Sequence, residues 1–203
     1  MNHISEHSYH LTPADRSAIK GHLPMLIWFT GFSGSGKSTL ADALEELLIS
    51  KGIHAYHLDG DSLRMGLNAD LGFTQEDRNE NIRRVGEVAN LMLDAGLVVL
   101  AAFISPLRSQ RELIRSRVGE HRFFEVHVST PIEVCELRDV KGLYAKARKG
   151  EIPEFTGISA PYEAPSNADV RIDTSQVELH EAVQIILNAI IGRGFTSVVE
   201  SNR

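Results

Sequence analysis

Five short apolar runs recur along the chain, and the segments between them carry hydrophobic residues at helical spacing. The apolar runs predict strands at residues 25–29, 55–58, 97–104, 123–128 and 170–172. Helical periodicity predicts helices at residues 39–50, 80–95, 107–118, 131–138 and 177–191. Unbroken apolar runs that alternate with helices are typical of parallel strands buried on both faces. The pattern therefore predicts an α/β fold with a central five-stranded parallel sheet covered by helices on both faces.

Two stretches interrupt this alternation, at residues 60–78 and 140–167. The second exceeds the usual length of a structureless connection in a compact domain. It also carries apolar and aromatic side chains that a plain linker would lack, namely Tyr144, Phe155, Ile158 and Tyr162. Long loops of this kind are usually functional, so we expect residues 140–167 to form a lid rather than a disordered linker.

The size and charge of the chain limit its function. Its 203 residues and 42% hydrophobic content favour one domain, which we expect at residues 24–203, after an N-terminal extension at residues 1–23. A formal net charge of −6 argues against a protein that wraps nucleic acid or lies on an anionic membrane. Any anionic ligand must therefore meet a local cluster of basic side chains.

The sequence contains few features that indicate a cellular compartment or a metal site. The single cysteine, Cys135, excludes an internal disulfide and is expected at a helix packing position. No apolar run approaches the length of about 18 residues that suggests a membrane span, and the polar start lacks a signal core; we expect a cytoplasmic protein. His3, His7 and His10 could ligate a metal, but without a second ligand group at metal spacing a frayed terminus is favoured.

The strongest motif follows the first predicted strand. Residues 31–38 match the phosphate-binding pattern G-x-x-x-x-G-K-[ST]. In this pattern backbone N–H groups surround a phosphate, Lys37 binds the β- and γ-phosphate oxygens, and Ser38 offers a hydroxyl to Mg²⁺. The motif predicts a P-loop NTPase-type three-layer fold. The predicted nucleotide-binding residues are Gly31, Phe32, Ser33, Gly34, Ser35, Gly36, Lys37, Ser38 and Thr39.

The second predicted strand ends in Asp59-Gly60-Asp61. Ligands of an open α/β sheet bind beyond the carboxyl ends of its strands. These carboxylates could therefore hold a magnesium water shell together with Ser38, and could accept a proton from an attacking hydroxyl. The alternative is an Asx turn that caps a helix beginning near Ser62 and leaves one carboxylate idle. Asp61 is the predicted general base.

Several side chains could bind an anionic second substrate at the same sheet edge. Ser105 follows the third predicted strand, and its hydroxyl could face the cleft or cap the next helix. Basic and amide groups from three further segments converge there, namely Arg64, Arg78, Asn81 and Lys141. Phe73 and Phe155 could sandwich a flat ring or simply anchor their loops. These features indicate a small P-loop phosphotransferase, because the N-K-x-D motif of guanine-specific switch proteins is missing.

Six segments together resemble the adenylylsulfate kinase family. They lie at residues 28–39, 58–61, 72–74, 78–84, 141–144 and 155–158. The resemblance implies transfer of the γ-phosphoryl group of ATP to the ribose 3′-hydroxyl of adenosine 5′-phosphosulfate, with Mg²⁺ as cofactor. The products would be 3′-phosphoadenosine 5′-phosphosulfate and ADP, and the step would belong to sulfate assimilation.

The resemblance also assigns roles to single residues. Asp61 resembles the base for the 3′-hydroxyl, and Arg138 resembles an arginine beside the ATP adenine. Lys141 would approach the transferring phosphoryl group, while Lys37 serves ATP. The family describes the serine that matches Ser105 as a phosphoserine intermediate, although direct in-line transfer needs none. The implied substrate-binding residues are Asp61, Arg64, Phe73, Arg78, Asn81, Ile104, Ser105, Lys141, Gly142, Leu143 and Phe155.

The resemblance bears on partners and leaves two alternatives. Many relatives carry a fused ATP sulfurylase domain, for which this chain has no space, so we expect a stand-alone homodimer that could associate with a separate ATP sulfurylase. One alternative is another P-loop kinase, acting on a nucleoside or a sugar acid. The other is a regulator that binds both nucleotides without turnover, although intact Lys37, Ser38 and Asp61 argue against it.

Overall fold

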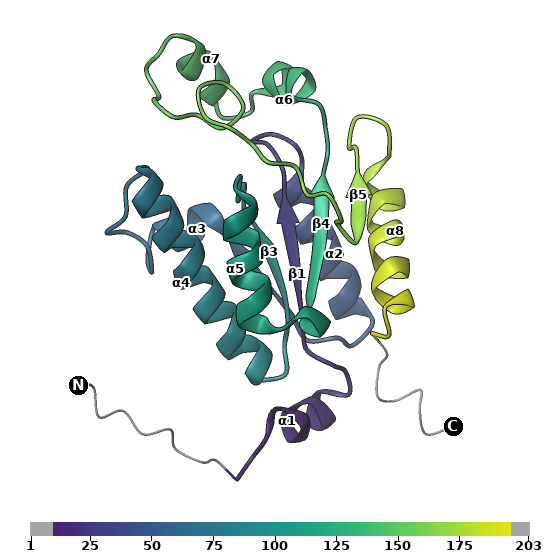
Figure 1. Cartoon of the computed structure of the whole chain (residues 1–203). Coiled ribbons are helices and arrows are strands. Elements are labelled where there is room, and N and C mark those ends of the chain that lie inside the picture. The colour runs from purple at the N-terminus through teal and green to yellow at the C-terminus, as the bar shows by residue number, and fades with distance from the viewer. Residues whose placement is uncertain (1–9, 196–203) are drawn as a thin grey trace, which may run out of the picture.

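The computed structural model of the protein describes residues 10–195 and contains one five-stranded parallel sheet (Figure 1). Its strands are β1 Met25–Thr30, β2 Ala55–Asp59, β3 Val98–Ala102, β4 Phe123–Val128 and β5 Val170–Ile172. They follow the spatial order β2-β3-β1-β4-β5, and every neighbouring pair is parallel. The predicted five-stranded parallel sheet is confirmed.

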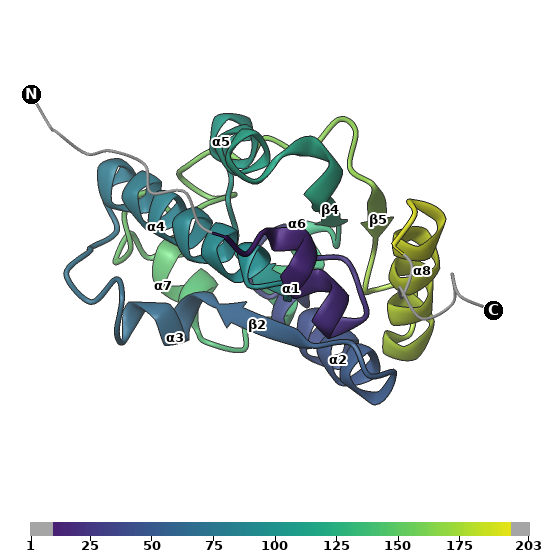
Figure 2. The ribbon, with the colours of Figure 1, turned by 90° about the horizontal axis from the view of Figure 1, so that it is seen from below.

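Helices cover both faces of the sheet, as expected (Figure 2). They are α1 Pro13–Lys20, α2 Lys37–Ser50, α3 Gly60–Arg64, α4 Gln75–Asp94, α5 Arg108–Val118, α6 Ile132–Arg138, α7 Leu143–Arg148 and α8 Leu179–Gly192, with a 3₁₀ turn η1 at Glu120–Arg122. One core packs α2 and α8 against side chains such as Ile27 and Phe29, and the other packs α4 and α5 against Leu26 and Trp28. Since successive strand side chains enter opposite cores, β1 must be apolar at both kinds of position.

The strand register places the functional loops at one edge of the sheet. Phe29 of β1 pairs with Ala102 of β3, and Asp59 of β2 pairs with the same Ala102. On the other side, Thr30 pairs with His127 of β4. The carboxyl ends of these strands therefore meet, and α6 and α7 lie beyond them at the top of Figure 1.

Both stretches that were predicted to be irregular contain helix. The first holds α3 and the start of α4, which begins at Gln75 rather than residue 80 because the Thr74 side chain accepts a hydrogen bond from the Asp77 backbone N–H. The second holds α7, which packs on its own small core together with Cys135 and Phe155. The predicted packing position of Cys135 is thus confirmed.

The predicted N-terminal extension contains a helix, α1, which has a capping box between Thr12 and Asp15. Arg16 of α1 pairs with Asp94 of α4 at 2.8 Å. Over residues 10–195, His10 belongs to no group of potential metal ligands, and His3 and His7 lie outside the described residues. No helix in that range is long and apolar enough to cross a membrane.

Candidate active site

The phosphate-binding loop joins β1 to α2, and its shape requires glycine. Gly36 has a φ of 99°, and a Cβ atom there would lie 3.2 Å from Thr174 Cγ2. A side chain on Gly31 would overlap the carbonyl oxygen of Val128. Both positions thus combine a backbone conformation that favours glycine with a close approach of other strands. The loop ends at the N-terminus of the 14-residue helix α2, whose dipole favours an anion.

Lys37 is buried and has no anionic partner among the described residues. Its Nζ donates a hydrogen bond to the backbone oxygen of Phe32 at 2.6 Å. Burial lowers the pKa of Lys37 to about 8, because the charged ammonium group loses hydration. A phosphate group would supply the charge that this ammonium lacks.

Two threonines that the sequence analysis missed hold the phosphate-binding loop in place. Thr130 follows β4 and Thr174 follows β5, and their hydroxyls donate to the backbone oxygen of Ser35 at 3.1 and 2.9 Å. Arg138 donates to the backbone and side-chain oxygens of Thr174 at 3.0 and 2.8 Å. Arg138 therefore lies beside the loop, while its predicted contact with adenine stays a prediction.

Asp59 serves as a helix cap and also faces the loop. Its Oδ2 accepts hydrogen bonds from the backbone N–H groups of Asp61 and Ser62, both at 3.1 Å, which is the Asx cap considered above. Its Oδ1 lies 3.5 Å from the donating hydroxyl of Ser38. Although burial opposes the effect, the backbone hydrogen bonds lower the pKa of Asp59, so the carboxylate is charged at neutral pH. These two oxygens are suited to Mg²⁺, which prefers hard oxygen ligands.

Asp61 and Lys141 meet across the site. The Asp61 carboxylate forms an ion pair with the Lys141 ammonium group, which comes from the lid segment. Both side chains remain largely exposed, with 71% and 59% of their surface accessible. Gly142 and Leu143 follow directly, with Gly142 at the N-cap of α7 and a φ of 65°. The pair connects the predicted base to the lid.

Three of the predicted contacts of the second substrate, Arg64, Arg78 and Asn81, come from α3 and α4. The Arg64 guanidinium lies 4.4 Å from the ring centroid of Phe73, which is 68% exposed. Arg78 donates to the backbone oxygens of Phe73 and Glu154 at 2.8 and 2.9 Å. Asn81 is buried and accepts a hydrogen bond from the side chain of an asparagine in the loop after α3. Arg78 thus joins the two stretches that carry the predicted aromatic clamp.

The two aromatic residues of the proposed clamp differ in their environment. Phe155 is only 8% exposed, and its ring packs edge-on against Tyr144 at 5.0 Å. The Tyr144 hydroxyl in turn donates to the backbone oxygen of Ser33 in the phosphate-binding loop at 2.9 Å. Phe155 therefore anchors the lid here, whereas the ring of Phe73 is exposed and is covered by Arg64 on one face. Their joint action as a clamp stays a prediction.

Ser105 corrects the sequence analysis. It is 2% exposed, and its hydroxyl accepts a hydrogen bond from Trp28 Nε1 at 3.0 Å. Neither the cleft-facing hydroxyl nor the helix cap considered above is present, since Leu107 occupies the N-cap position of α5. Ser105 also has a φ of 37°, a left-handed conformation that is uncommon for residues other than glycine. The neighbouring Ile104 carbonyl accepts from the Thr30 hydroxyl at 2.7 Å.

The phosphate-binding loop is the predicted donor side of the site, the residues Arg64, Phe73, Arg78 and Asn81 are its predicted acceptor side, and Asp61 is paired with Lys141. The family model for adenylylsulphate kinase matches residues 23–173. The chain belongs to this family. The adenylyl-sulfate kinase of Shewanella amazonensis is 59% identical over 195 residues, which are 96% of this chain and 98% of that protein. The corresponding enzyme of Shewanella denitrificans is 60% identical over 187 residues, covering 92% of this chain and 91% of its own.

Solved structures agree with membership of the adenylylsulfate kinase family. The APS kinase of Mycobacterium tuberculosis in complex with AMPPNP and APS is 50% identical, with a TM-score of 0.80, and the match covers 83% of this chain and 98% of that one. A hexameric APS kinase from Thiobacillus denitrificans is 31% identical, with a TM-score of 0.66, and matches 86% of this chain but 30% of its own. A gluconokinase from Sinorhizobium meliloti, 19% identical with a TM-score of 0.56 over 89% of this chain and 99% of that one, shares the fold alone.

Proposed function

We propose that the protein transfers the γ-phosphoryl group of ATP to the 3′-hydroxyl of adenosine 5′-phosphosulfate, giving 3′-phosphoadenosine 5′-phosphosulfate and ADP. This is the reaction of adenylyl-sulfate kinases and a step of sulfate assimilation. The observation that carries the proposal is the APS kinase of Mycobacterium tuberculosis, which holds AMPPNP and APS together and is 50% identical to this chain.

The phosphate-binding loop and Lys37 bind and orient the triphosphate. In phosphoryl transfer the transition state is loose, and negative charge lies on the peripheral oxygens of the moving group. Cationic groups aimed at those oxygens therefore lower the barrier more than a strong base does. Lys37 and the N-terminus of α2 provide this charge from one side, and Lys141 of the lid provides it from the other.

Asp61 acts as the base for the acceptor hydroxyl. Its carboxylate is paired with Lys141. When adenosine 5′-phosphosulfate binds, we expect the 3′-hydroxyl to take the place of Lys141 next to Asp61, while Lys141 turns to the phosphoryl group. The proton of the hydroxyl passes to Asp61 as its oxygen bonds to phosphorus, and ADP leaves on the opposite side.

Mg²⁺ is the proposed cofactor, held through the Ser38 hydroxyl and Asp59 Oδ1, directly or through its water shell, with Asp61 as the third predicted oxygen ligand. When bound, the ion neutralises charge on the β- and γ-phosphate oxygens. The 3.5 Å separation of the Ser38 and Asp59 oxygens, at the start of α2 and the end of β2, supports this assignment.

No covalent enzyme intermediate belongs to the proposed mechanism. The Ser105 hydroxyl is buried against Trp28, and a serine nucleophile needs an adjacent base to remove its proton. The chemistry is therefore a direct transfer between the two nucleotides.

We further propose a homodimer in the cytoplasm that works with a separate ATP sulfurylase. The compartment follows from the need for ATP and from the unpaired cysteine. Light scattering coupled to size-exclusion chromatography tests the dimer directly, and a mass of one chain, or of six as in the hexameric relative, contradicts it. Co-purification with the sulfurylase of the same cells tests the association.

The function is tested by ADP release from Mg·ATP with a panel of acceptors. We expect turnover with adenosine 5′-phosphosulfate and none with AMP, adenosine, gluconate or shikimate. Turnover with another acceptor alone would support a different P-loop kinase. Tight binding of ATP and adenosine 5′-phosphosulfate without ADP release would instead support a regulator.

A further inference from the structure

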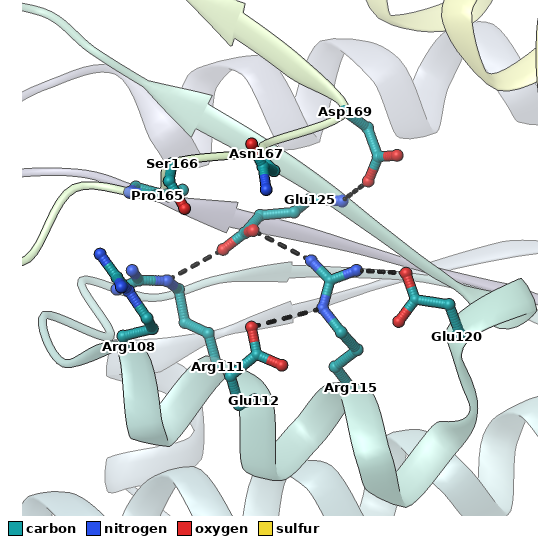
Figure 3. A pocket seen from close by; sticks show the side chains of 10 residues that line it. All are labelled: Arg108, Arg111, Glu112, Arg115, Glu120, Glu125, Pro165, Ser166, Asn167 and Asp169. Carbon is teal, nitrogen blue, oxygen red and sulfur yellow. Dashed lines mark hydrogen bonds and ion pairs between the residues drawn. The ribbon is translucent and has the colours of Figure 1, made fainter.

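A cavity of about 290 Å³ lies between α5, η1 and the segment before β5, away from the phosphate-binding loop (Figure 3). Two of its arginines, Arg111 and Arg115, are paired with carboxylates of the same cavity. The Glu125 carboxylate lies between Arg111 and Arg115, at 2.9 and 3.1 Å from their guanidinium nitrogens. Arg115 also pairs with Glu120 at 2.7 Å. The guanidinium groups of Arg111 and Arg115 are thus occupied by carboxylates of the protein, which leaves them little capacity for an anionic ligand.

Arg111 differs from Arg115 in what else it binds. Its side chain is 2% exposed. One terminal nitrogen donates to the backbone oxygen of Ser105 at 2.7 Å, and the other donates to the backbone oxygen of Glu163 at 2.6 Å. A single planar group thus joins the end of β3, the C-terminal end of the lid segment and, through Glu125, the middle of β4. Only arginine presents donors in this fixed fork.

The two carbonyl groups belong to segments that shape the acceptor side. Ser105 has its unusual φ of 37° directly after Ile104, a predicted contact of adenosine 5′-phosphosulfate. The segment after Ser105 is fastened to the lid end by two more hydrogen bonds, from the Glu163 N–H to the Pro106 oxygen at 2.8 Å and from the Arg108 N–H to the Glu163 carboxylate at 2.7 Å. The position of the lid end and the position of Ile104 are therefore fixed together.

Tyr162, the residue before Glu163, contacts the phosphate-binding loop and the end of β1. The Tyr162 hydroxyl lies 3.1 Å from the hydroxyl of Thr30, which also binds the Ile104 carbonyl. The Tyr162 ring contacts Phe32 of the phosphate-binding loop, with 4.8 Å between ring centroids. Arg111 is thus the buried member of a hydrogen-bond network that extends, through Glu163 and Tyr162, to the Ile104 carbonyl and to Phe32 of the phosphate-binding loop.

We propose that Arg111, held by Glu125, is a positioning residue for adenosine 5′-phosphosulfate: it fixes the Ile104–Ser105 wall and the lid end in the geometry that binds the acceptor. The proposal rests on the proposed kinase function. A buried ion pair contributes little net stability compared with apolar side chains of similar size, because both charges lose hydration. The directed hydrogen bonds to the two carbonyl groups, rather than the charge itself, carry the function.

The test compares Arg111→Lys with Arg115→Lys by steady-state kinetics and thermal unfolding. Arg115 is the matched control, because it shares Glu125 and the cavity but binds neither Ser105 nor Glu163. We expect Arg111→Lys to raise the KM for adenosine 5′-phosphosulfate about tenfold or more, the size of one lost charged hydrogen bond, with the KM for ATP changed less than about twofold. Arg115→Lys should change neither KM beyond that limit. An unchanged KM in Arg111→Lys overturns the proposal.

The double variant Arg111→Met/Glu125→Leu tests the proposal if Arg111→Lys does not fold. It removes both members of the buried ion pair, so neither charge is left without its partner. We expect it to fold, with a lower melting temperature because Arg115 loses Glu125 and two carbonyl groups lose a donor, and to show the same selective rise in the KM for adenosine 5′-phosphosulfate. Wild-type values of both KM would show that the network is merely structural. If the wild-type protein itself releases no ADP with adenosine 5′-phosphosulfate, the proposed function fails, and this proposal fails with it; normal wild-type turnover with unaffected variants rejects this proposal alone.

Discussion

Lys141 and Asp61 lie 80 positions apart in the chain and form an ion pair between the lid segment and the first turn of α3. The pair has two consequences. It holds the carboxylate of the predicted base against the Lys141 ammonium group, and it ties the lid segment to α3. In the proposed mechanism substrate binding separates the two groups, because Asp61 then faces the 3′-hydroxyl and Lys141 faces the phosphoryl group.

Asp61→Asn removes the base while it keeps the size and hydrogen-bonding capacity of the side chain. We expect kcat to fall by about 10² to 10⁴, the range typical of one general base, and ATP affinity to fall far less, since the phosphate-binding loop, Lys37 and Ser38 stay in place. Single-turnover ADP release and ATP titration calorimetry measure the two quantities. Glu46→Gln, an exposed carboxylate on α2, serves as the control. An unchanged kcat would reduce Asp61 to a residue of the turn.

Lys141→Ala tests the other member of the pair. A cation aimed at the transferring group contributes roughly 2.7–4 kcal/mol in comparable sites, so we expect kcat to fall by about 10² or more. The matched control is Lys146→Ala, an exposed lysine of the same lid on α7. Equal effects of the two substitutions would mean that only the general charge of the lid matters, and that Lys141 has no specific role.

The sheet and the phosphate-binding loop could be predicted because their signals are local. An apolar run, a glycine motif and a helical stretch lie next to one another in the chain, and each independently favours the structure found. The start of α4 also had a local signal, Thr74 followed three residues later by Asp77, which was overlooked. Thr130 and Thr174 could have been found as well, since each lies two positions after the end of β4 or β5, whereas only the positions after the first three strands were considered.

The environments of Ser105 and Phe155 could not be predicted, because they depend on distant partners. Ser105 is buried, and its hydroxyl accepts a hydrogen bond from Trp28, 77 positions earlier in the chain. Phe155 is buried because α7 forms inside the lid and presents Tyr144 to it. A sequence motif shows that such residues are near the site, but burial is decided by tertiary packing and has no local pattern.

The pKa of Lys37 gives ATP binding a pH dependence. The buried ammonium has a pKa of about 8 instead of 10.5, and ATP binds its protonated form. The dissociation constant of ATP should therefore increase as the pH rises from 7 to 9, with proton uptake on binding above pH 8, whereas Lys37→Ala should bind weakly at every pH. Without ATP, the unfolded chain binds more protons than the folded chain between about pH 8 and 10.5, so the contribution of Lys37 to the free energy of unfolding increases with pH over that window. Calorimetry of ATP binding in buffers of different ionisation enthalpy measures the proton uptake on binding. Binding without proton uptake above pH 8 contradicts the assignment of Lys37 as the cation that binds ATP.

Ser105→Ala separates a structural role from a covalent one. The substitution leaves the buried Trp28 Nε1 without its acceptor, which costs about 1–3 kcal/mol. We expect unfolding in urea to shift accordingly, with the fluorescence of Trp28, the chain's single tryptophan, as the probe, while kcat stays within about tenfold of the wild type.

Ser105→Gly is the matched partner of this substitution, because it loses the same hydrogen bond but accepts the φ of 37° more easily. We expect it to be about 1 kcal/mol more stable than Ser105→Ala. If Ser105 formed a phosphoserine intermediate, both variants would lose turnover completely, and acid quenching of the wild-type reaction with γ-labelled ATP would trap phosphate on this residue. Surviving activity in both variants, with no label on the wild-type chain, is the outcome that direct transfer between the two nucleotides requires.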